Sequence, residues 1–536
     1  MKGVKRPVLL GLAMLALAGP IFADEKEELL ELRLTVVNLL QSLVERGVLT
    51  EADAAAMVAD AQRSAAQVAA EQTTEADQLR DGDVRVTYVP EIVREQLREE
   101  IRAEIAAGVV ADVKKDAAEE GWGIPESLPD WVDRITLGGD FRVRAEGLFF
   151  GADNARNTYL DFTAVNDAGG IDRAGINAII NTTEDRVRLR GAARFTIGSE
   201  LSDSWYAYAR IATGSIPNPL SRNQTLGRFG QTWQTNIDRA YLQWSPEPTG
   251  TFSQGVQVGR IFKPWPGTDL VWDNDVGFEG LYYDLTAAFD SERRDSLRVG
   301  LGYFAINEVD FTADDGFLAS FDLLGRIGWG DDSNLFVNAA YYHYENITGI
   351  RNAPDSDLTD FTAPRRFQRG NTLFDIRNDL DPTTNLFALA AEYRLVNIST
   401  GFETTLASGM PLRFTADYVS NIGFDEADVL QNTGLSIRER TDGYAAYLLL
   451  GREELYERGE WSAEVGYRYL ERDAVVDAFT DSNFGGGATD TQGYHLRMRY
   501  AFADDVWLDV RWLSSSEIDG PPLTIDSLLI DLNSRF

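Results

Sequence analysis

From about residue 121 onward, hydrophobic and polar residues alternate with a period of two in one segment after another. The segment 523–536 shows the pattern simply. Leu528, Ile530 and Leu532 fall on one face, and Asp531 and Asn533 fall on the other. This period is that of a β-strand with one apolar and one polar face. The pattern therefore predicts a chain built mainly of two-faced strands.

Sixteen such segments can be counted, and the connections between them alternate between short and long. Residues 199–203 form a short connection, for example, whereas residues 214–235 form a long one. An even number of strands, with short turns at one end and long loops at the other, is typical of outer-membrane β-barrels. The connection 396–411 is longer than a tight turn, so the position of the tenth or eleventh strand stays open. The predicted strands centre on residues 135–146, 185–198, 204–213, 236–245, 252–262, 276–289, 295–306, 317–329, 333–344, 384–396, 411–421, 441–452, 460–471, 492–502, 505–514 and 523–536.

We expect these strands to close into an antiparallel transmembrane β-barrel of about sixteen strands over residues 131–536. An open apolar strand edge would pair with other molecules, and closing the barrel removes that edge. The terminal Phe536 agrees with this expectation, because the closing strand of such barrels often ends in an aromatic residue. Belts of aromatic residues at the membrane interfaces are expected from residues near strand ends, among them Tyr282, Tyr283, Tyr341 and Tyr342.

The first 120 residues differ from the rest. Residues 1–23 are predicted to be a signal peptide, because a basic start is followed by a short apolar core and a cleavage site at Ala23. Residues 24–120 are predicted to form a periplasmic helical segment, in which Leu29, Leu32 and Val36 begin the heptad seam of a coiled coil. Such a seam suits self-association, and we expect a homotrimer; a helical cap on the barrel mouth is the alternative.

Composition excludes several classes of protein. No stretch after the N-terminus is apolar for eighteen residues, so helical membrane spans are not expected in the mature protein. The chain has no Cys, which removes disulfides and thiolate metal sites. Its net charge of −35 disfavours nucleic acid as a partner. The only histidines are His343 and His495, so neither enzymatic activity nor a cofactor is expected.

Arginines recur on the polar faces of several predicted strands. In residues 184–198, Leu189 lies on one face while Arg188 and Arg190 lie on the other. If the last strand pairs with the first, one side of the lumen carries a ladder of arginines, which stay charged in any environment. The alternative is that acids such as Asp531 pair with them structurally, and we expect both, with surplus positive charge. The predicted pore-lining residues are Arg142, Arg144, Arg186, Arg188, Arg190, Arg194, Arg210, Arg497, Arg499 and Arg511.

The connection after the fifth strand, GRIFKPWPGTDLVWDNDVGFEG, has the features of a loop that folds into the lumen. Pro264 and Pro266 would stiffen it, and Trp265 and Trp272 would anchor it against a wall. Its acids would then face the arginine ladder, and charged constrictions set pore selectivity. An acidic surface loop is the alternative. The predicted constriction residues are Lys263, Asp269, Asp273 and Asp275.

Several segments also carry a family resemblance. GWGIPESLPDWVDRITLGGDFRVRAE, RVRLRGAARFTIGSELSD and GRIFKPWPGTDLVWDNDVGFEGL, in this order, resemble the putative porin family of Gram-negative bacteria. The resemblance covers most of the chain. It implies a β-barrel porin in outer-membrane lipid, with an N-terminal periplasmic helical segment.

Two functions are compatible with these features. We expect an outer-membrane porin that allows passive diffusion of small hydrophilic solutes or ions, with a weak preference for anions. The alternative is a structural protein with a non-conducting barrel, which contacts the cell wall through its helical segment. Ion conductance in planar bilayers distinguishes the two.

Overall fold

The computed structural model of the chain describes residues 134–536, except 217, 290–294, 311–313, 331, 380 and 382. The predicted signal peptide (1–23) and periplasmic helical segment (24–120) lie outside the described residues, as do 131–133 of the predicted barrel. The first strand, β1, begins at Ile135.

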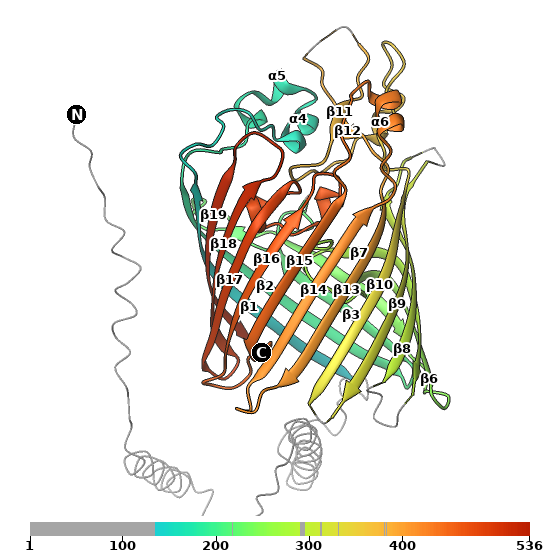
Figure 1. Cartoon of the computed structure of the whole chain (residues 1–536), viewed down its shortest axis with the longest axis vertical. Coiled ribbons are helices and arrows are strands. Elements are labelled where there is room, and N and C mark those ends of the chain that lie inside the picture. The colour runs from blue at the N-terminus through green and yellow to red at the C-terminus, as the bar shows by residue number, and fades with distance from the viewer. Residues whose placement is uncertain are drawn as a thin grey trace, which may run out of the picture. The chain divides into compact units, whose positions relative to one another are not determined.

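Sixteen antiparallel strands form one closed barrel (Figure 1). Each strand pairs with its neighbour in the chain, and β19 pairs with β1, with Asp140 opposite Arg535. The predicted closed antiparallel barrel of sixteen strands is confirmed. The barrel strands are β1 (Ile135–Phe150), β2 (Arg186–Ser202), β3 (Trp205–Thr213), β5 (Thr235–Trp244), β6 (Phe252–Phe262), β7 (Gly277–Ala288), β8 (Ser296–Asn307), β9 (Gly316–Trp329), β10 (Ser333–Glu345), β13 (Arg394–Thr405), β14 (Pro411–Asn421), β15 (Asp442–Gly451), β16 (Trp461–Leu470), β17 (Thr491–Ala503), β18 (Val506–Glu517) and β19 (Thr524–Arg535).

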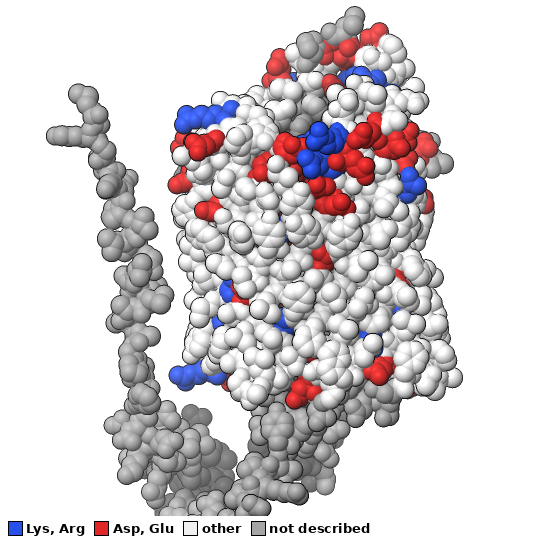
Figure 2. Space-filling view, viewed as in Figure 1, with Lys and Arg blue, Asp and Glu red and all other residues white. Residues whose placement is uncertain are grey.

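The alternation of the sequence separates an apolar outer face from a polar lumen. In β1, Leu137 is 76% exposed, whereas Arg144 is 1% exposed. Successive side chains of a strand point to opposite faces, so this contrast follows directly from the period of two. Over the middle of the barrel, the face seen in Figure 2 carries few charged side chains, and the charges gather toward the long-loop end. An uncharged outer belt of this kind suits a hydrocarbon environment.

The two ends of the barrel differ. At one end the connections are tight, as at residues 504–505, where Asp505 has a φ of 55°. At the other end the connections are long and carry short elements (Figure 1). None of the helices in the described part of the chain has the length and apolarity to cross a bilayer. The loop elements are α4 (Phe162–Ala168), α5 (Ile171–Ala174), β4 (Gln224–Thr225), β11 (Leu373–Asp375), β12 (Phe387–Leu389), α6 (Glu426–Thr433) and the 3₁₀ turns Gly175–Ala178, Asp360–Thr362, Asp477–Phe479 and Phe484–Gly486.

The seam between β19 and β1 is completed by the C-terminal residue. The Phe536 backbone N–H donates to the Gly139 carbonyl at 3.1 Å, and the Gly139 N–H donates to the Phe536 carbonyl at 3.0 Å. The Phe536 ring lies over Gly139, where a Cβ would come within 2.6 Å of it. Its centroid is 5.8 Å from that of Phe195 on β2. The aromatic terminus therefore spans the seam on the outer face.

The predicted tenth strand is wrong. It was expected at residues 384–396, but the tenth strand of the barrel is β13, at Arg394–Thr405. A turn at residues 406–410 then leads into β14. The apolar residues before β13 instead belong to the β10–β13 loop, where Ala388 is fully buried and Leu389 is 2% exposed. Ala388 packs with other loop residues and Leu389 packs with the lumen core, so neither contacts lipid and their hydrophobicity imitated a strand.

Half of the lumen holds a hydrophobic core. The β6–β7 loop (residues 263–276) folds into the barrel, and its Trp265 and Trp272 pack at 5.4 Å between ring centroids. Both rings contact Tyr342 of β10 edge-on, at 4.9 and 5.1 Å. The prediction that Tyr282 and Tyr342 belong to the membrane belts is therefore wrong. Tyr282 (3% exposed) and Tyr342 (0%) face this core instead. In each adjacent tyrosine pair only one member can face outward.

Candidate functional site in the barrel lumen

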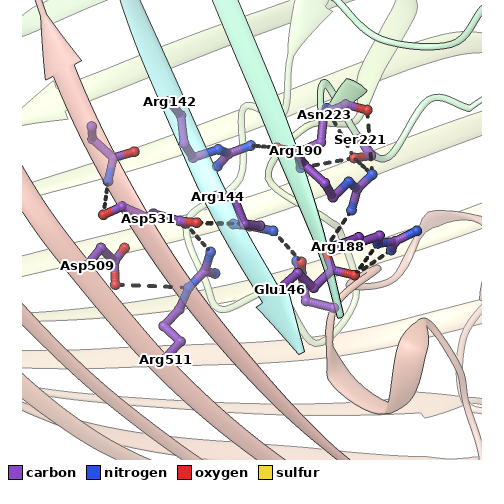
Figure 3. A network of polar contacts seen from close by, with 12 residues as sticks. Arg142, Arg144, Glu146, Arg188, Arg190, Ser221, Asn223, Asp509, Arg511 and Asp531 are labelled. Atoms are coloured by element: carbon purple, nitrogen blue, oxygen red, sulfur yellow. Dashed lines mark hydrogen bonds and ion pairs between the residues drawn. The ribbon is translucent and has the colours of Figure 1, made fainter. Parts of the chain in front are cut away.

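The other half of the lumen is polar and rich in arginine. Strands β17, β18, β19, β1 and β2 are consecutive neighbours around the barrel. Their inward arginines lie side by side in Figure 3, where Arg142, Arg144, Arg188, Arg190 and Arg511 surround a few acids. We call this surface the basic wall. Its residues are Arg142, Arg144, Arg188, Arg190, Arg194, Arg497, Arg499 and Arg511.

Carboxylates on the same strands pair with part of the basic wall. Arg144 donates to both carboxylate oxygens of Asp531, from Nε at 2.6 Å and from Nη2 at 2.7 Å. Arg511 reaches the same Asp531 at 3.1 Å. Arg144 and Asp531 are each only 2% exposed, so the pair is shielded from salt. Charge-assisted bidentate pairs are strong and directional, and this one joins β1 to β19.

Three further acids hold other arginines in the same way. Glu146 accepts from Arg188 at 2.8 Å and from Arg190 at 3.0 Å. Asp140 accepts from Arg194 at 2.8 Å, and Asp509 accepts from Arg497 at 2.9 Å. These pairs fix the arginines structurally, as the sequence alternative anticipated.

Surplus positive charge remains after this pairing. In the described part of the chain, Arg142 and Arg499 lie within salt-bridge distance of no carboxylate. The Arg142 guanidinium donates to the Asn223 side chain at 2.9 Å, and its Nε has no hydrogen-bond partner among the described residues. Arg499 instead donates to Ser462 Oγ at 2.9 Å and to backbone carbonyls. Both cations are available to an anion in the lumen.

The remaining two predicted pore residues lie apart from this group. Arg210 of β3 is held by Asp238 at 2.6 Å, and Arg222 shares the same carboxylate at 2.8 Å. Arg186, at the long-loop end of β2, is exposed and lines a different cavity together with Arg188. The ladder therefore extends from the long-loop mouth into the lumen rather than forming one ring.

The β6–β7 loop carries acids that face the basic wall. Asp275 lies 3.5 Å from Arg194, which joins the loop to the wall. Asp269 accepts from Tyr447 at 3.3 Å and lies 3.7 Å from Arg468. The ammonium group of Lys263 donates to the Trp272 carbonyl at 3.3 Å within the loop itself.

Asp273 is the most unusual acid of this loop. It is 5% exposed and accepts backbone N–H groups from Asp275 at 2.7 Å and Ser482 at 2.9 Å. Burial, together with the charges of Asp275 and Asp481, raises the pKa of Asp273 to about 8. Burial also acts on Asp275, but Arg194 and other arginines outweigh it and lower the pKa of Asp275 below its ordinary value. The two acids thus differ in charge near neutral pH.

Sequence reasoning missed a second loop in the lumen. This is the β16–β17 loop (residues 471–490), which reaches the basic wall from the opposite side. Its Asn483 accepts from Arg144 at 3.1 Å, and Asp481 lies 4.0 Å from Arg468, a buried cation that was also missed. The signal was present in Ala474–Val476, an apolar run inside a polar loop, which is buried against the lumen core.

Between the basic wall and the two loops lies a cavity of about 450 Å³. Seven arginines and eight acids line it, and the arginines come from the wall and the ends of its strands. The loops contribute Asp269, Asp273, Asp275 and Asp481 from the opposite side. A transverse arrangement of this kind places a field across the passage, where low dielectric strengthens each charge.

No cluster of three metal-ligating side chains occurs among residues 134–536 apart from the positions left undescribed. His495 lies on the lumen face, 3.5 Å from Glu464.

A closed barrel with an apolar belt, long loops at one end and a loop-narrowed polar lumen defines the porin class of membrane proteins. The chain belongs to the family described as "Putative porin", whose match covers residues 33–536. The family and the barrel fold support an outer-membrane location and a channel rather than an enzyme.

The chain has low similarity to several solved outer-membrane proteins. OprB of Pseudomonas putida has 11% identity and a TM-score of 0.42, with 76% of this chain and 95% of that chain covered. OmpT of Vibrio cholerae, in a trimer form, has 10% identity and a TM-score of 0.40, over 75% and 100% of the two chains. OmpF of Salmonella typhi, in complex with daunomycin, has 10% identity and a TM-score of 0.37, over 75% and 97%. No curated protein matches the chain.

Proposed function

We propose that the protein is an outer-membrane porin for passive diffusion of small hydrophilic solutes or ions, with a weak preference for anions. The observation that carries the proposal is the cavity between the basic wall and the acidic β6–β7 loop. The acids on the wall are engaged in ion pairs, whereas Arg142 forms no ion pair among the described residues and donates only to Asn223. Charge at the narrowest part of a pore outweighs charge at the mouths, which salt screens within about 10 Å.

The non-conducting tether is the second candidate. It is favoured by the contacts that cross the lumen, Arg194 with Asp275 at 3.5 Å and Arg144 with Asn483 at 3.1 Å. If these contacts and the hydrophobic core close the passage, the barrel is a membrane anchor. The helical segment of residues 24–120 would then supply the function, by contact with the cell wall. We further propose that this segment stabilises a homotrimer through its heptad seam, which chemical cross-linking of the full-length protein tests.

The test is conductance of the full-length protein in planar bilayers, with the reversal potential measured across a KCl gradient. We expect discrete conducting steps and a reversal potential on the anion-selective side. Arg142→Gln should move the reversal potential toward cation selectivity, because it removes a lumen charge that no carboxylate compensates. Arg438→Gln is the matched control, since Arg438 is an exposed loop residue that does not line the cavity.

Absence of conducting steps from folded, heat-modifiable protein would favour the tether. Conducting steps with the same reversal potential in wild type and Arg142→Gln would keep the porin function but remove the basic wall as its selectivity element.

A further inference from the structure

A second cavity lies at the long-loop end of the barrel, and its lining shares no residue with the cavity at the basic wall. Its volume is about 460 Å³, which is within the range of small-molecule sites. It is enclosed by the outer ends of β1 and β2, by α4, and by the β10–β13 and β16–β17 loops. We call it the vestibule.

The charged side chains of the vestibule are mainly cationic. Four arginines line it, and two acids, Asp161 and Asp167, accompany them. Asp161 is engaged in capping α4, where its carboxylate accepts from the Ala164 N–H at 3.0 Å. Glu146 holds Arg188, and Glu517 lies 3.5 Å from Arg369, so the vestibule cations without an ion pair among the described residues are Arg186 and Arg366, and these two favour an anion. The arginines are Arg186, Arg188, Arg366 and Arg369.

Several of these cations have unused hydrogen-bonding capacity. The buried Nε atoms of Arg366 and Arg369 have no acceptor among the described residues. Arg369 is only 7% exposed, with Glu517 at 3.5 Å and the Gly485 carbonyl at 3.3 Å from its Nη2. Buried donors without a partner are costly and uncommon in folded proteins. An anion bound between the arginines would supply the missing acceptors.

Apolar side chains line part of the vestibule. Phe150, Ile180 and Phe367 line it beside the arginines, with Leu148 and Ile525. The Phe367 backbone is held in place by the Thr163 hydroxyl, which accepts from its N–H at 3.0 Å. Inorganic anions would leave this apolar surface in contact with water. A carboxylate with an apolar body would use both halves of the lining.

The opposite side of the vestibule is formed by three consecutive glycines. Gly485, Gly486 and Gly487 have φ values of 63°, 75° and 90°, a conformation that other residues rarely adopt. A Cβ on Gly487 would come within 1.9 Å of Gln368 Oε1. Gln368 in turn donates to the carbonyls of Asp477 and Thr480 at 2.7 and 2.8 Å. The β16–β17 loop is thus shaped to close one side of the vestibule.

We propose that the vestibule binds small organic monocarboxylates with an apolar body, which would then pass along the basic wall. This deepens the proposed porin function, and its transport step rests on it. Binding itself requires only the vestibule, so binding and conduction are measured separately.

The probe is benzoate, titrated by calorimetry into detergent-solubilised full-length protein at neutral pH and low salt. Benzamide, its uncharged isostere, and inorganic phosphate are titrated in parallel. We expect benzoate to bind, benzamide not to bind, and phosphate to bind more weakly than benzoate. Arg366→Gln and Arg186→Gln should each weaken benzoate binding about tenfold, the loss expected for one charge-assisted hydrogen bond. Arg365→Gln is the control, because Arg365 is the exposed neighbour and does not line the vestibule.

The results that would contradict the proposal, or the porin function beneath it, are distinct. No heat of binding with benzoate removes the site, and equal binding of benzamide removes the role of the arginines. Phosphate bound more tightly than benzoate would indicate a phosphate-bearing ligand, such as a lipid headgroup, instead. Unchanged benzoate affinity in both glutamine variants would place the binding elsewhere. Benzoate binding without KCl conductance would refute the porin function alone, and conductance without benzoate binding would refute the vestibule alone.

Discussion

Replacing Trp265 with Ala is expected to release the β6–β7 loop from the barrel strands it packs against, without opening the barrel. Trp265 is 3% exposed and contacts Trp272, Phe278 and Tyr342 at 5.4, 5.0 and 4.9 Å between ring centroids. Truncating a buried Trp to Ala costs about 3–5 kcal/mol. Because the contacts with Phe278 and Tyr342 join the loop to barrel strands, the substitution mainly destabilises the docked state of the loop.

Such a cost raises the population of the undocked loop relative to the docked loop by roughly 10²- to 4 × 10³-fold. The loop keeps other attachments, since Thr268 donates to Asp417 from both its N–H and its hydroxyl at 3.0 Å, and Asp275 lies 3.5 Å from Arg194. We therefore expect a loop that fluctuates around these attachments. In planar bilayers the variant should show larger and noisier single-channel currents than wild type, and should admit larger polyethylene glycols.

Trp512→Ala is the matched control for this variant. Trp512 is 36% exposed on the outer face and stacks on Phe149 at 6.3 Å, so its loss does not touch the loop. Heat modifiability on gels verifies that both barrels are folded. Identical current amplitude and noise in Trp265→Ala and wild type, with both folded, would refute the view that this ring holds the loop.

Three other predictions concern charge, closure and stability. Because the pKa of Asp273 is about 8, raising the pH from 6 to 9.5 should add a negative charge to the lumen and shift the reversal potential toward cations; Asp273→Asn should abolish this shift, and a persisting shift would assign it to another group. Arg144→Met removes the bidentate partner of the buried Asp531, which keeps only Arg511 at 3.1 Å, and should lower stability by about 3 kcal/mol in urea unfolding, whereas Arg144→Met with Asp531→Leu should recover much of the loss; no difference between the two variants would contradict the pairing. Phe536→Asp should reduce the folded protein recovered from outer membranes, because a carboxylate would replace the ring over Gly139, while Phe536→Tyr should be tolerated; normal recovery of Phe536→Asp would exclude a role in closure.

Most of the barrel could be predicted from the sequence, because lipid on one side and a polar lumen on the other impose a strict period of two. Strand β14, for example, was predicted at 411–421 and lies at Pro411–Asn421. Strand β13 was missed because the apolar run around Leu389 is as hydrophobic as a membrane strand, although Leu389 packs inside the lumen. Hydrophobicity alone does not distinguish contact with lipid from contact with an interior core.

The candidate site was less accessible to sequence reasoning. Alternation placed Arg144 and Arg511 on inward faces, but the carboxylate that holds them depends on the register of closure, which sets Arg144 opposite Asp531. Similarly, the β16–β17 loop reaches Arg144 through Asn483, across 339 positions of sequence. Local patterns carry no information on contacts at such separations.

The hydrophobic core inside the barrel gives the lumen two sides with different thermodynamic character. The side with Trp265 and Trp272 is stabilised by apolar packing, which weakens on cooling and responds little to electrolyte. The side with Arg142 and Arg499 depends on charges, whose reach contracts as ionic strength rises. The two sides of the lumen therefore differ in what perturbs them: temperature acts on the packing of the first, and salinity acts on the charges of the second. Cooling would weaken the apolar packing of the first side. A lower salt concentration would extend the reach of the charges on the second side.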